Sequence, residues 1–352
     1  MNQNQSREYD KSFTKGWPDE QLWWDFHEAQ WQAEPDLFTM DCIIRAQGAE
    51  RPPEDARVSA TASEDLDLLN AVITPPAFES VERGQEFSEL MRLSEVRDLP
   101  FNELDTNFRE SLRVMSYFAE LQTVNPYVPG VDFMTTVEEF EAIHRGENPL
   151  TRADRIGLPR HFQTGRDLAT FVHNDNPMIN WMPVVGELLK LKVPKRTEFS
   201  PHHPDCNADG DFTCWGAPKL IGMLGEIVER VGHLSFRQKW WSLVARPEEY
   251  AYKMGLRLLP QAFPEGSPMH PSFTAMHAFL AYAQGYLLKE IFDTYYILPN
   301  GNSVGYEIDL WAANIADARL WAGVHFISDN ELVKDRALSL AKRVAAKHLQ
   351  IV

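Results

Sequence analysis

The chain has 352 residues, of which 44% are hydrophobic and 11% aromatic, so it can bury the core of one large domain or two ordinary ones. Its formal net charge of -17 argues against a broad nucleic-acid surface, because such a surface needs clustered Lys and Arg side chains. The chain shows no signal-like N-terminal segment and no apolar run of membrane-spanning length. We therefore expect a cytoplasmic protein that does not enter a membrane.

Helical periodicity marks nearly every regular segment of the chain. Ser80 is placed to cap a helix that follows it, and Thr136 opens the capping box Thr-Val-Glu-Glu before a second helix. Longer patterns of apolar residues at helical spacing follow at 217–232, 277–292 and 307–323. No alternating segment is long enough to predict a competing strand.

These patterns predict an all-α fold, a compact bundle of many helices. We expect one large domain over residues 1–352, with N-terminal helices in the approximate half 1–165 and the bundle that carries the candidate site in 166–352. Proline-rich and charged stretches place the long connections near residues 45–75 and 193–215.

The second of these connections contains a candidate calcium site. Residues 205–211 read Asp-Cys-Asn-Ala-Asp-Gly-Asp, which puts oxygen ligands at alternate positions, as at the start of an EF-hand loop. The candidate ligands are Asp205, Asn207, Asp209 and Asp211. The twelfth position of the loop is Gly216 and not a bidentate Glu, so an acidic surface loop is the alternative interpretation.

The chain has three cysteines, Cys42, Cys206 and Cys214, too few for a disulfide framework, which fits a reducing compartment. Cys206 and Cys214 bracket a short loop, so a disulfide between them is an open alternative. With His202 and His203 they also allow a zinc site, although their spacing matches no standard zinc finger.

Two basic residues in the second half stand at a helical interval. Lys239 and Arg246 are seven positions apart, which places both on one face if a single helix spans them. Taken alone, a Lys and an Arg beside tryptophans are typical of a solvated helix edge. The pair gains meaning only from the residues that follow it.

Arg319, His325 and Asp329 follow at intervals of six and four positions. Six positions is not a same-face spacing on a continuous helix, so we expect the helix to end at Gly323. Arg319 would then point from the last turn, and His325 would arrive from the loop. A single buried His satisfied within the core is the alternative.

A third segment, SPMHPSFTAMHAF, places His270 and His277 seven positions apart. Pro271 argues against a helix through the whole stretch, at least at its start. Whether the two imidazoles are packed in the core or face a substrate depends on the residues around them.

Together these residues form one long pattern. It runs Lys239, six residues, Arg246 and a proline; then a four-residue turn that ends at His277; then Arg319, five residues, His325, three residues and Asp329. The pattern resembles the signature of the vanadium-dependent haloperoxidases and of the acid phosphatases that share their fold. In a phosphatase of this fold, the imidazole that corresponds to His325 attacks phosphorus covalently.

The resemblance is closer to the bromoperoxidase branch. In SPMHPSF, His270 stands where that branch has a histidine. The resemblance covers nearly the whole chain, although the chain is shorter than typical members. Other similar segments are KSFTKGWP (11–18), PPAFES (75–80), VRDLPFNELDTN (96–107) and GRDLATFVH (165–173).

The resemblance implies a vanadate cofactor. Vanadate is a tetrahedral oxyanion, and converging cations offset the cost of taking it out of water. By resemblance, Lys239, Arg246 and Arg319 donate to its oxygens, and a nitrogen of His325 is its axial ligand.

The resemblance also implies catalytic roles. His277 is the acid–base group that assists peroxide binding, Lys239 polarises the peroxide, and His270 tunes protons near His277. The implied partners are hydrogen peroxide, a halide and a small organic acceptor, and the family suggests a homo-oligomer. Bromide or iodide is expected ahead of chloride, because His270 resembles the bromoperoxidase branch.

The turn before His277 departs from the family. The family has Pro-Ser-Gly-His where this chain has Thr-Ala-Met-His. Ala275 replaces a serine hydroxyl, and a hydrogen bond to a charged group is worth roughly 1.5–3 kcal/mol. Met276 replaces a glycine; it keeps the N–H that faces the oxyanion but is strained if its φ is positive. A further departure is Ala318, where the phosphatase pattern has a serine.

The sequence leads to three hypotheses for the function. The first is a haloperoxidase, with a homologue of altered or lost halogenation activity as its variant. The second is a phosphatase that acts on phosphate esters through His325. The third is a non-catalytic helical protein that assembles through its aromatic segment at 17–31, WPDEQLWWDFHEAQW.

Overall fold

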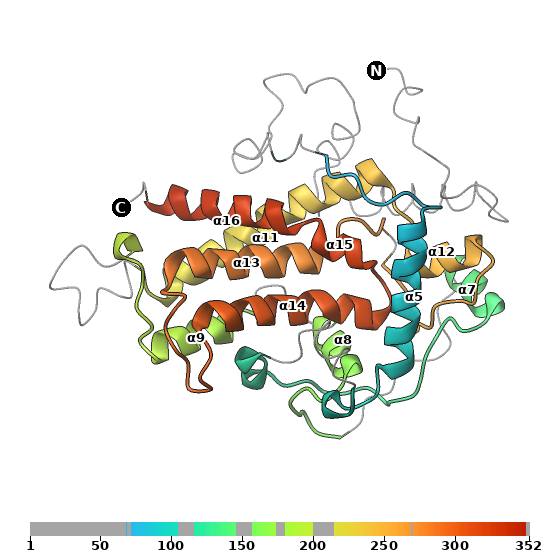
Figure 1. Cartoon of the computed structure of the whole chain (residues 1–352), viewed down its shortest axis with the longest axis horizontal. Helices are drawn as coiled ribbons and strands as arrows, with labels where there is room; N and C mark the ends of the chain where they lie inside the picture. Colours follow the sequence, from blue (N-terminus) through green and yellow to red (C-terminus); the bar gives the residue numbers. More distant parts are fainter. Residues whose placement is uncertain are drawn as a thin grey trace, which may run out of the picture.

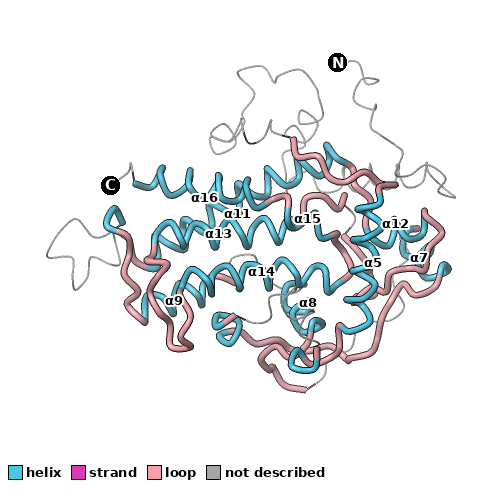
Figure 2. Tube along the Cα trace, viewed as in Figure 1, coloured by secondary structure: helices cyan, strands magenta, loops and turns pink. Residues whose placement is uncertain are grey.

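The computed structural model describes residues 68, 72–104, 116–145, 157–173, 180–199, 215–268 and 270–349. These residues form helices joined by loops, as Figure 2 shows. The β-bridges among them are isolated pairs. The predicted all-α fold is confirmed. None of the described helices is long and apolar enough to cross a membrane.

The described helices divide between the two halves of the chain. The first group is α5 (Val81–Val96), α7 (Val137–His144), α8 (Gly165–His173) and α9 (Met182–Lys190). The second group is α11 (Ala217–Ser242), α12 (Pro247–Lys253), α13 (Met276–Ile291), α14 (Val304–Ala322), α15 (Ile327–Glu331) and α16 (Lys334–Leu349). Short 3-10 turns are η3 (Phe101–Glu103), η4 (Tyr117–Leu121) and η5 (Thr197–Phe199).

Helix α13 forms the centre of the bundle. Its side chains are buried on nearly all sides, from Ala278 to Ile291, as expected of a helix without a polar face. Helices α11, α14 and α16 pack against it, and Figure 1 shows α16, α13 and α14 running side by side. Helix α5 crosses near the end of α14, where the residues of the candidate site begin.

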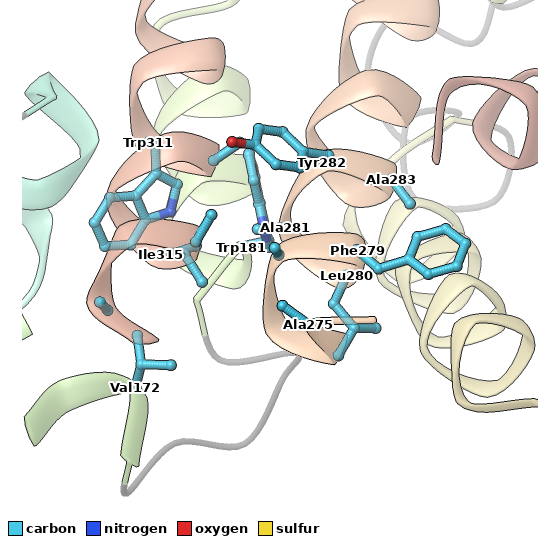
Figure 3. Close-up of a cluster of buried hydrophobic side chains, with 14 of the residues drawn as sticks. Val172, Trp181, Ala275, Phe279, Leu280, Ala281, Tyr282, Ala283, Trp311 and Ile315 are labelled. Atoms are coloured by element: carbon cyan, nitrogen blue, oxygen red, sulfur yellow. The ribbon is translucent and has the colours of Figure 1, made fainter. Parts of the chain in front are cut away.

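Tryptophan packing fixes α13 against α14. Figure 3 shows Trp181 beside α13 and Trp311 on α14. A Cβ on Gly285 of α13 would lie 2.9 Å from the Trp181 ring, so only glycine permits this approach. The Nε1 of Trp311 donates to the carbonyl of Asn180, 3.0 Å away, so its buried donor is satisfied. Asn180 and Trp181 thereby connect α13 to α14.

The predicted helix caps are present. Ser80 Oγ accepts from the backbone N of Arg83 at 3.1 Å, and Thr136 Oγ1 accepts from the backbone N of Glu139 at 3.2 Å. The side chain of Glu139 accepts from the backbone N–H of Thr135, one residue before the N-cap N–H that a capping box uses. The sequence signal therefore located both helix starts.

Candidate functional site

Lys239 and Arg246 do not share one helix, so the condition for a common helix face is not met. Lys239 lies in the last turn of α11, and Leu243 ends the helix in the left-handed region with φ of 48°. Its N–H still donates to the Lys239 carbonyl at 2.9 Å. Arg246 is the N-cap of α12. The chain changes direction between the two residues, and their side chains nevertheless reach the same cluster.

Helix α14 ends where the sequence predicted. Gly323 has φ of 86°, a conformation that favours glycine, and a Cβ there would lie 3.0 Å from Gln261 Nε2 and 3.2 Å from a carbonyl oxygen. Arg319 occupies the last turn of α14, and His325 follows in the loop before α15. This part of the prediction is confirmed.

The guanidinium of Arg246 joins two of the three predicted site histidines. Its Nη1 lies 3.1 Å from Nε2 of His325, and its Nη2 lies 3.0 Å from Nδ1 of His270. Its other bonds go to the carbonyls of Val324 at 2.7 Å and His270 at 3.0 Å. Because a guanidinium only donates, Nδ1 of His270 accepts and carries no proton. Nη1 of Arg246 also lies 3.4 Å from Nδ1 of His325, so the tautomer of His325 follows from its other partners.

Asp329 holds the other side of His325. The Nδ1 of His325 lies 3.0 Å from Asp329 Oδ2, which also accepts from Ser272 Oγ and, at 3.1 Å, from the N–H of Phe326. A carboxylate at this nitrogen fixes the proton on Nδ1 and puts the lone pair on Nε2, where a metal or a phosphorus atom would replace Arg246 Nη1 as its partner. His325 is therefore held in the tautomer that either chemistry needs.

Asp329 and Ser272 were given no role in the predictions from the sequence. Asp329 was part of the pattern, and its spacing of four from His325 was the available signal. Ser272 lies 53 positions from His325, and its Oγ stands 3.3 Å from the Nδ1 of His325. Only the resemblance of the segment around His270 pointed to it, so its contact with Asp329 was missed.

The ammonium of Lys239 is fully buried and donates to the carbonyls of Pro271 and Ser272, both at 2.9 Å. Burial holds the pKa of Lys239 well below its ordinary value, and the charge of Arg246 lowers it further, while Asp329 opposes both. The charge of Arg319 also lowers it, by less than the causes named above.

Both imidazoles are neutral for the same reason. Burial holds the pKa of His325 well below its ordinary value, and the charges of Arg246, Lys239 and Arg319 add to the effect. Burial likewise lowers the pKa of His270, followed by the charges of Lys239 and Arg246. Neutral imidazoles therefore lie next to buried cations, and Asp329 supplies the carboxylate that contacts His325.

Carboxylates do not neutralise these cations at contact distance. Among the described residues, the side chains of Lys239 and Arg246 donate only to backbone carbonyls and imidazole nitrogens. Two carboxylates contact residues of the described cluster without bonding to these cationic side chains: Asp329 bonds to His325 and Ser272, and Glu249 accepts from the backbone N of Arg246 at 2.7 Å. Buried cations without a paired anion are costly, and a bound oxyanion would offset that cost.

The altered turn lies at the start of α13. Ala275 is its buried N-cap, has no side chain that can cap the helix, and donates its N–H to the Asp329 carbonyl at 3.2 Å. Met276 is the first helical residue, does not have a positive φ, and packs its half-buried side chain against the core. The strain considered for Met276 therefore does not arise. His277 is half-buried at the next position of α13.

The other predicted sites lie outside the described residues. These comprise the calcium candidates at 205–211, the three cysteines, His202 and His203, and the aromatic segment at 17–31. In the described part of the chain, His, Cys, Asp and Glu side chains do not form a group of three that could hold a metal cation.

Comparisons with known proteins add sequence and fold relationships. No family model matches the chain. A vanadium-dependent bromoperoxidase of Corallina officinalis is 39% identical over 90 residues, which cover 20% of this chain and 15% of that protein. The corresponding enzyme of Corallina pilulifera is 38% identical over 90 residues, with the same coverage of both chains. The matched segment thus spans about 15% of the length of these curated relatives.

The fold gives the second relationship. A homohexameric vanadate-dependent bromoperoxidase from Ascophyllum nodosum superposes with a TM-score of 0.68 over 95% of this chain and 76% of that one, at 17% sequence identity. This likeness shows that the chain has the all-α fold of that enzyme. The Corallina matches, which cover 20% of this chain, and this likeness of fold support the resemblance of the Lys239 to Asp329 pattern to the vanadium-dependent haloperoxidases.

Proposed function

We propose that the chain binds vanadate and uses hydrogen peroxide to oxidise a halide, bromide or iodide before chloride, to a hypohalous-acid equivalent. The observation that carries the proposal is the buried cation cluster of Lys239 and Arg246, whose side chains contact only neutral groups among the described residues. An oxyanion with several negative oxygens is the ligand that this charge pattern favours.

The residues of the cluster fit vanadate in two respects. Cationic donors come from Lys239, Arg246 and, through its charge, Arg319. The neutral Nε2 of His325, held by Asp329 on the opposite nitrogen, is a ligand for the metal. When bound, vanadate supplies a Lewis acid that activates peroxide without a change of oxidation state. Ala275 is the position at which the chain lacks a donor.

The roles of the chain's own residues follow from this arrangement. Arg246 orients the imidazoles of His325 and His270 and donates to Nε2 of the first and Nδ1 of the second. His277, at the start of α13, is the proposed acid–base group, and Lys239 is the proposed donor to the peroxide oxygen. His270 accepts from Arg246 on Nδ1, which leaves its Nε2–H as the proton that it can offer.

Halogenation of a phenolic dye by peroxide, after loading with vanadate, tests this function. The wild type should brominate the dye, and His325→Ala should lose the activity because the metal ligand is gone. His348→Ala is the matched control, since His348 lies on α16 and pairs with Glu226 at 2.8 Å. Activity that persists in His325→Ala, or that needs no vanadate, would contradict the proposal.

A phosphatase is the second candidate, because one geometric feature favours it. A carboxylate on Nδ1 and an unprotonated Nε2 also make His325 a nucleophile toward phosphorus. It predicts turnover of a chromogenic phosphate ester that vanadate inhibits competitively. The halogenation assay separates the two, because a phosphatase alone gives no halide-dependent oxidation.

Assembly is a further part of the proposal. The Ascophyllum nodosum relative is a homohexamer, and we propose that this chain also forms a homo-oligomer. Size-exclusion chromatography with light scattering tests this point, and a monomer at all concentrations would contradict it.

A further inference from the structure

An ion pair on α5 reaches the loop that carries His325. Arg83 and Glu86 are three positions apart on α5, and Arg83 Nη1 lies 3.0 Å from Glu86 Oε2. Both side chains are almost fully buried, at 2% and 10% of their exposed areas. Figure 1 shows α5 crossing beside α15 at the end of α14. This pair is separated from His325 by more than 230 positions, and the sequence pattern assigned it no role.

Glu86 holds the first turn of α15. Its Oε1 accepts from the backbone N of Ser328 at 2.7 Å, and its Oε2 accepts from Ser328 Oγ at 3.2 Å. The N-cap of α15 is Phe326, whose side chain offers no acceptor for the free N–H groups of that turn. A carboxylate from another helix therefore supplies the cap that α15 lacks.

Arg83 holds the residue next to His325. Its guanidinium carbon lies 4.0 Å from the centroid of the Phe326 ring, and its Nη2 donates to the carbonyl of Pro76 at 3.1 Å. The ring of Tyr250 on α12 meets Phe326 from another direction, with centroids 5.8 Å apart and planes at 89°. Phe326 is thereby fixed between α5 and α12.

These contacts enclose the segment that orients the imidazole. The N–H of Phe326 donates to Asp329 Oδ2, the same oxygen that receives the bond from His325 Nδ1. Ser328 lies between these residues in sequence and is fixed by Glu86. Loss of the Glu86 acceptor would free the first turn of α15 and, with it, the Asp329 carboxylate.

We propose that Arg83 and Glu86 are positioning residues for the site: Glu86 fixes α15 through the Ser328 amide and thereby holds His325 with its proton on Nδ1. The effect on the imidazole stands on the hydrogen bonds alone. The expected effect on vanadate affinity rests in addition on the proposed function.

Two double variants isolate the hydrogen bond from the charge. In the first, Arg83→Met is combined with Glu86→Leu, which removes the acceptor without leaving a buried charge unpaired. In the second, Arg83→Met is combined with Glu86→Gln, which removes the same charges but keeps an oxygen for the Ser328 N–H. Glu89→Gln is the surface control, since Glu89 pairs with Arg92 on the exposed face of α5.

The readout is the ¹⁵N spectrum of histidine-labelled protein without vanadate at one fixed pH, with the His325 signals assigned from His325→Ala. Wild type, Glu89→Gln and the Gln double variant should show one tautomer with the proton on Nδ1. The Leu double variant should show a mixture of tautomers or broadened His325 signals. Vanadate titration of the same samples should give an affinity about tenfold weaker in the Leu variant only, the usual size of such an effect.

An unchanged His325 spectrum in the folded Leu double variant would overturn the inference, even if its melting temperature fell. If that variant does not fold, Glu86→Asp decides, because it keeps the charge beside Arg83 but draws the carboxylate back from Ser328. A wild-type spectrum in Glu86→Asp would likewise overturn it. If the wild type binds no vanadate, the proposed function fails, and the spectra still decide the role of Glu86.

Discussion

Two clusters of buried arginines in this protein differ in their balance of charge. In the first, Arg97 and Arg166 meet Asp98 and Asp132, with contacts of 2.6 Å from Arg166 to each carboxylate and 3.3 Å from Arg97 to Asp132. In the second, Lys239 and Arg246 donate to carbonyls and imidazoles. Each buried cation of the first cluster has a carboxylate partner, and those of the second leave positive charge for a ligand.

The pKa values of Asp98 and Lys239 follow this contrast, although burial also lowers the pKa of Arg97, to about 10. Burial raises the pKa of Asp98, but the hydrogen bonds and charge of Arg166 outweigh it and hold the pKa below its ordinary value. Around Lys239 burial and a second cation act in the same direction, and its pKa falls far below that of a free lysine. The comparison suggests that charge balance distinguishes a structural cluster from a binding one.

The largest expected effect is in the first cluster, called the balanced cluster below because its arginines are paired with Asp98 and Asp132. Arg166→Met leaves Asp98 and Asp132 without their main partner and should lower the free energy of unfolding by roughly 3–5 kcal/mol. Urea unfolding of the vanadate-free protein measures the change. A loss below about 1 kcal/mol would contradict a structural role for this cluster.

A ligand should stabilise only the second cluster, that of Lys239 and Arg246, called the unbalanced cluster below. Vanadate at a hundred times its dissociation constant should raise the free energy of unfolding of the wild type by about 2.7 kcal/mol. The same concentration should stabilise Lys239→Met much less, because a cationic donor is gone. Equal stabilisation of the wild type and Lys239→Met would place the vanadate elsewhere.

Ala275→Ser should strengthen the unbalanced cluster. A hydroxyl at the N-cap of α13 adds a donor to the oxyanion, worth roughly 1.5–3 kcal/mol, or about ten- to a hundredfold in vanadate affinity. Calorimetric titration beside the wild type measures it. Unchanged affinity would show that the Ala275 side chain does not face the ligand.

The smallest effect concerns Lys239 without vanadate. Lys239→Met relieves a buried ammonium but leaves the carbonyls of Pro271 and Ser272 without a donor, so stability should change by less than about 1 kcal/mol near neutral pH. Because the folded-state pKa is depressed, the unfolded chain binds more protons between that pKa and roughly 10.4. In that window a rise in pH should stabilise the wild type relative to Lys239→Met, as unfolding curves at several pH values would show. The opposite slope would contradict a depressed pKa.

The sequence predicted the elements of the site better than their arrangement. The Ser80 and Thr136 caps and the helix end at Gly323 depend on local residues, and the structure confirms them. The break at Leu243 was not predicted, because a leucine in the left-handed region has no sequence signature. Lys239 and Arg246 therefore do not share the continuous helix considered for them.

Long-range partners formed the other gap. Ser272 contacts Asp329 across 57 positions, and Glu86 contacts Ser328 across 242 positions. Neither contact follows from spacing, since the first depends on how the loop before α13 meets α15 and the second on how α5 packs against α15. The segments VRDLPF and GRDLATFVH, singled out by resemblance, contribute Arg97, Asp98 and Arg166 to the balanced cluster. In this chain these segments therefore belong to the ion-paired cluster and not to the candidate site.

The most direct test of the account is isothermal titration of phosphate-free protein with orthovanadate, beside His325→Ala. The account predicts saturable binding to the wild type, with one vanadate per chain, that disappears in His325→Ala. Absence of binding to a folded wild type, or equal binding to His325→Ala, would contradict the claim that the cluster around Lys239, Arg246 and His325 is an oxyanion site.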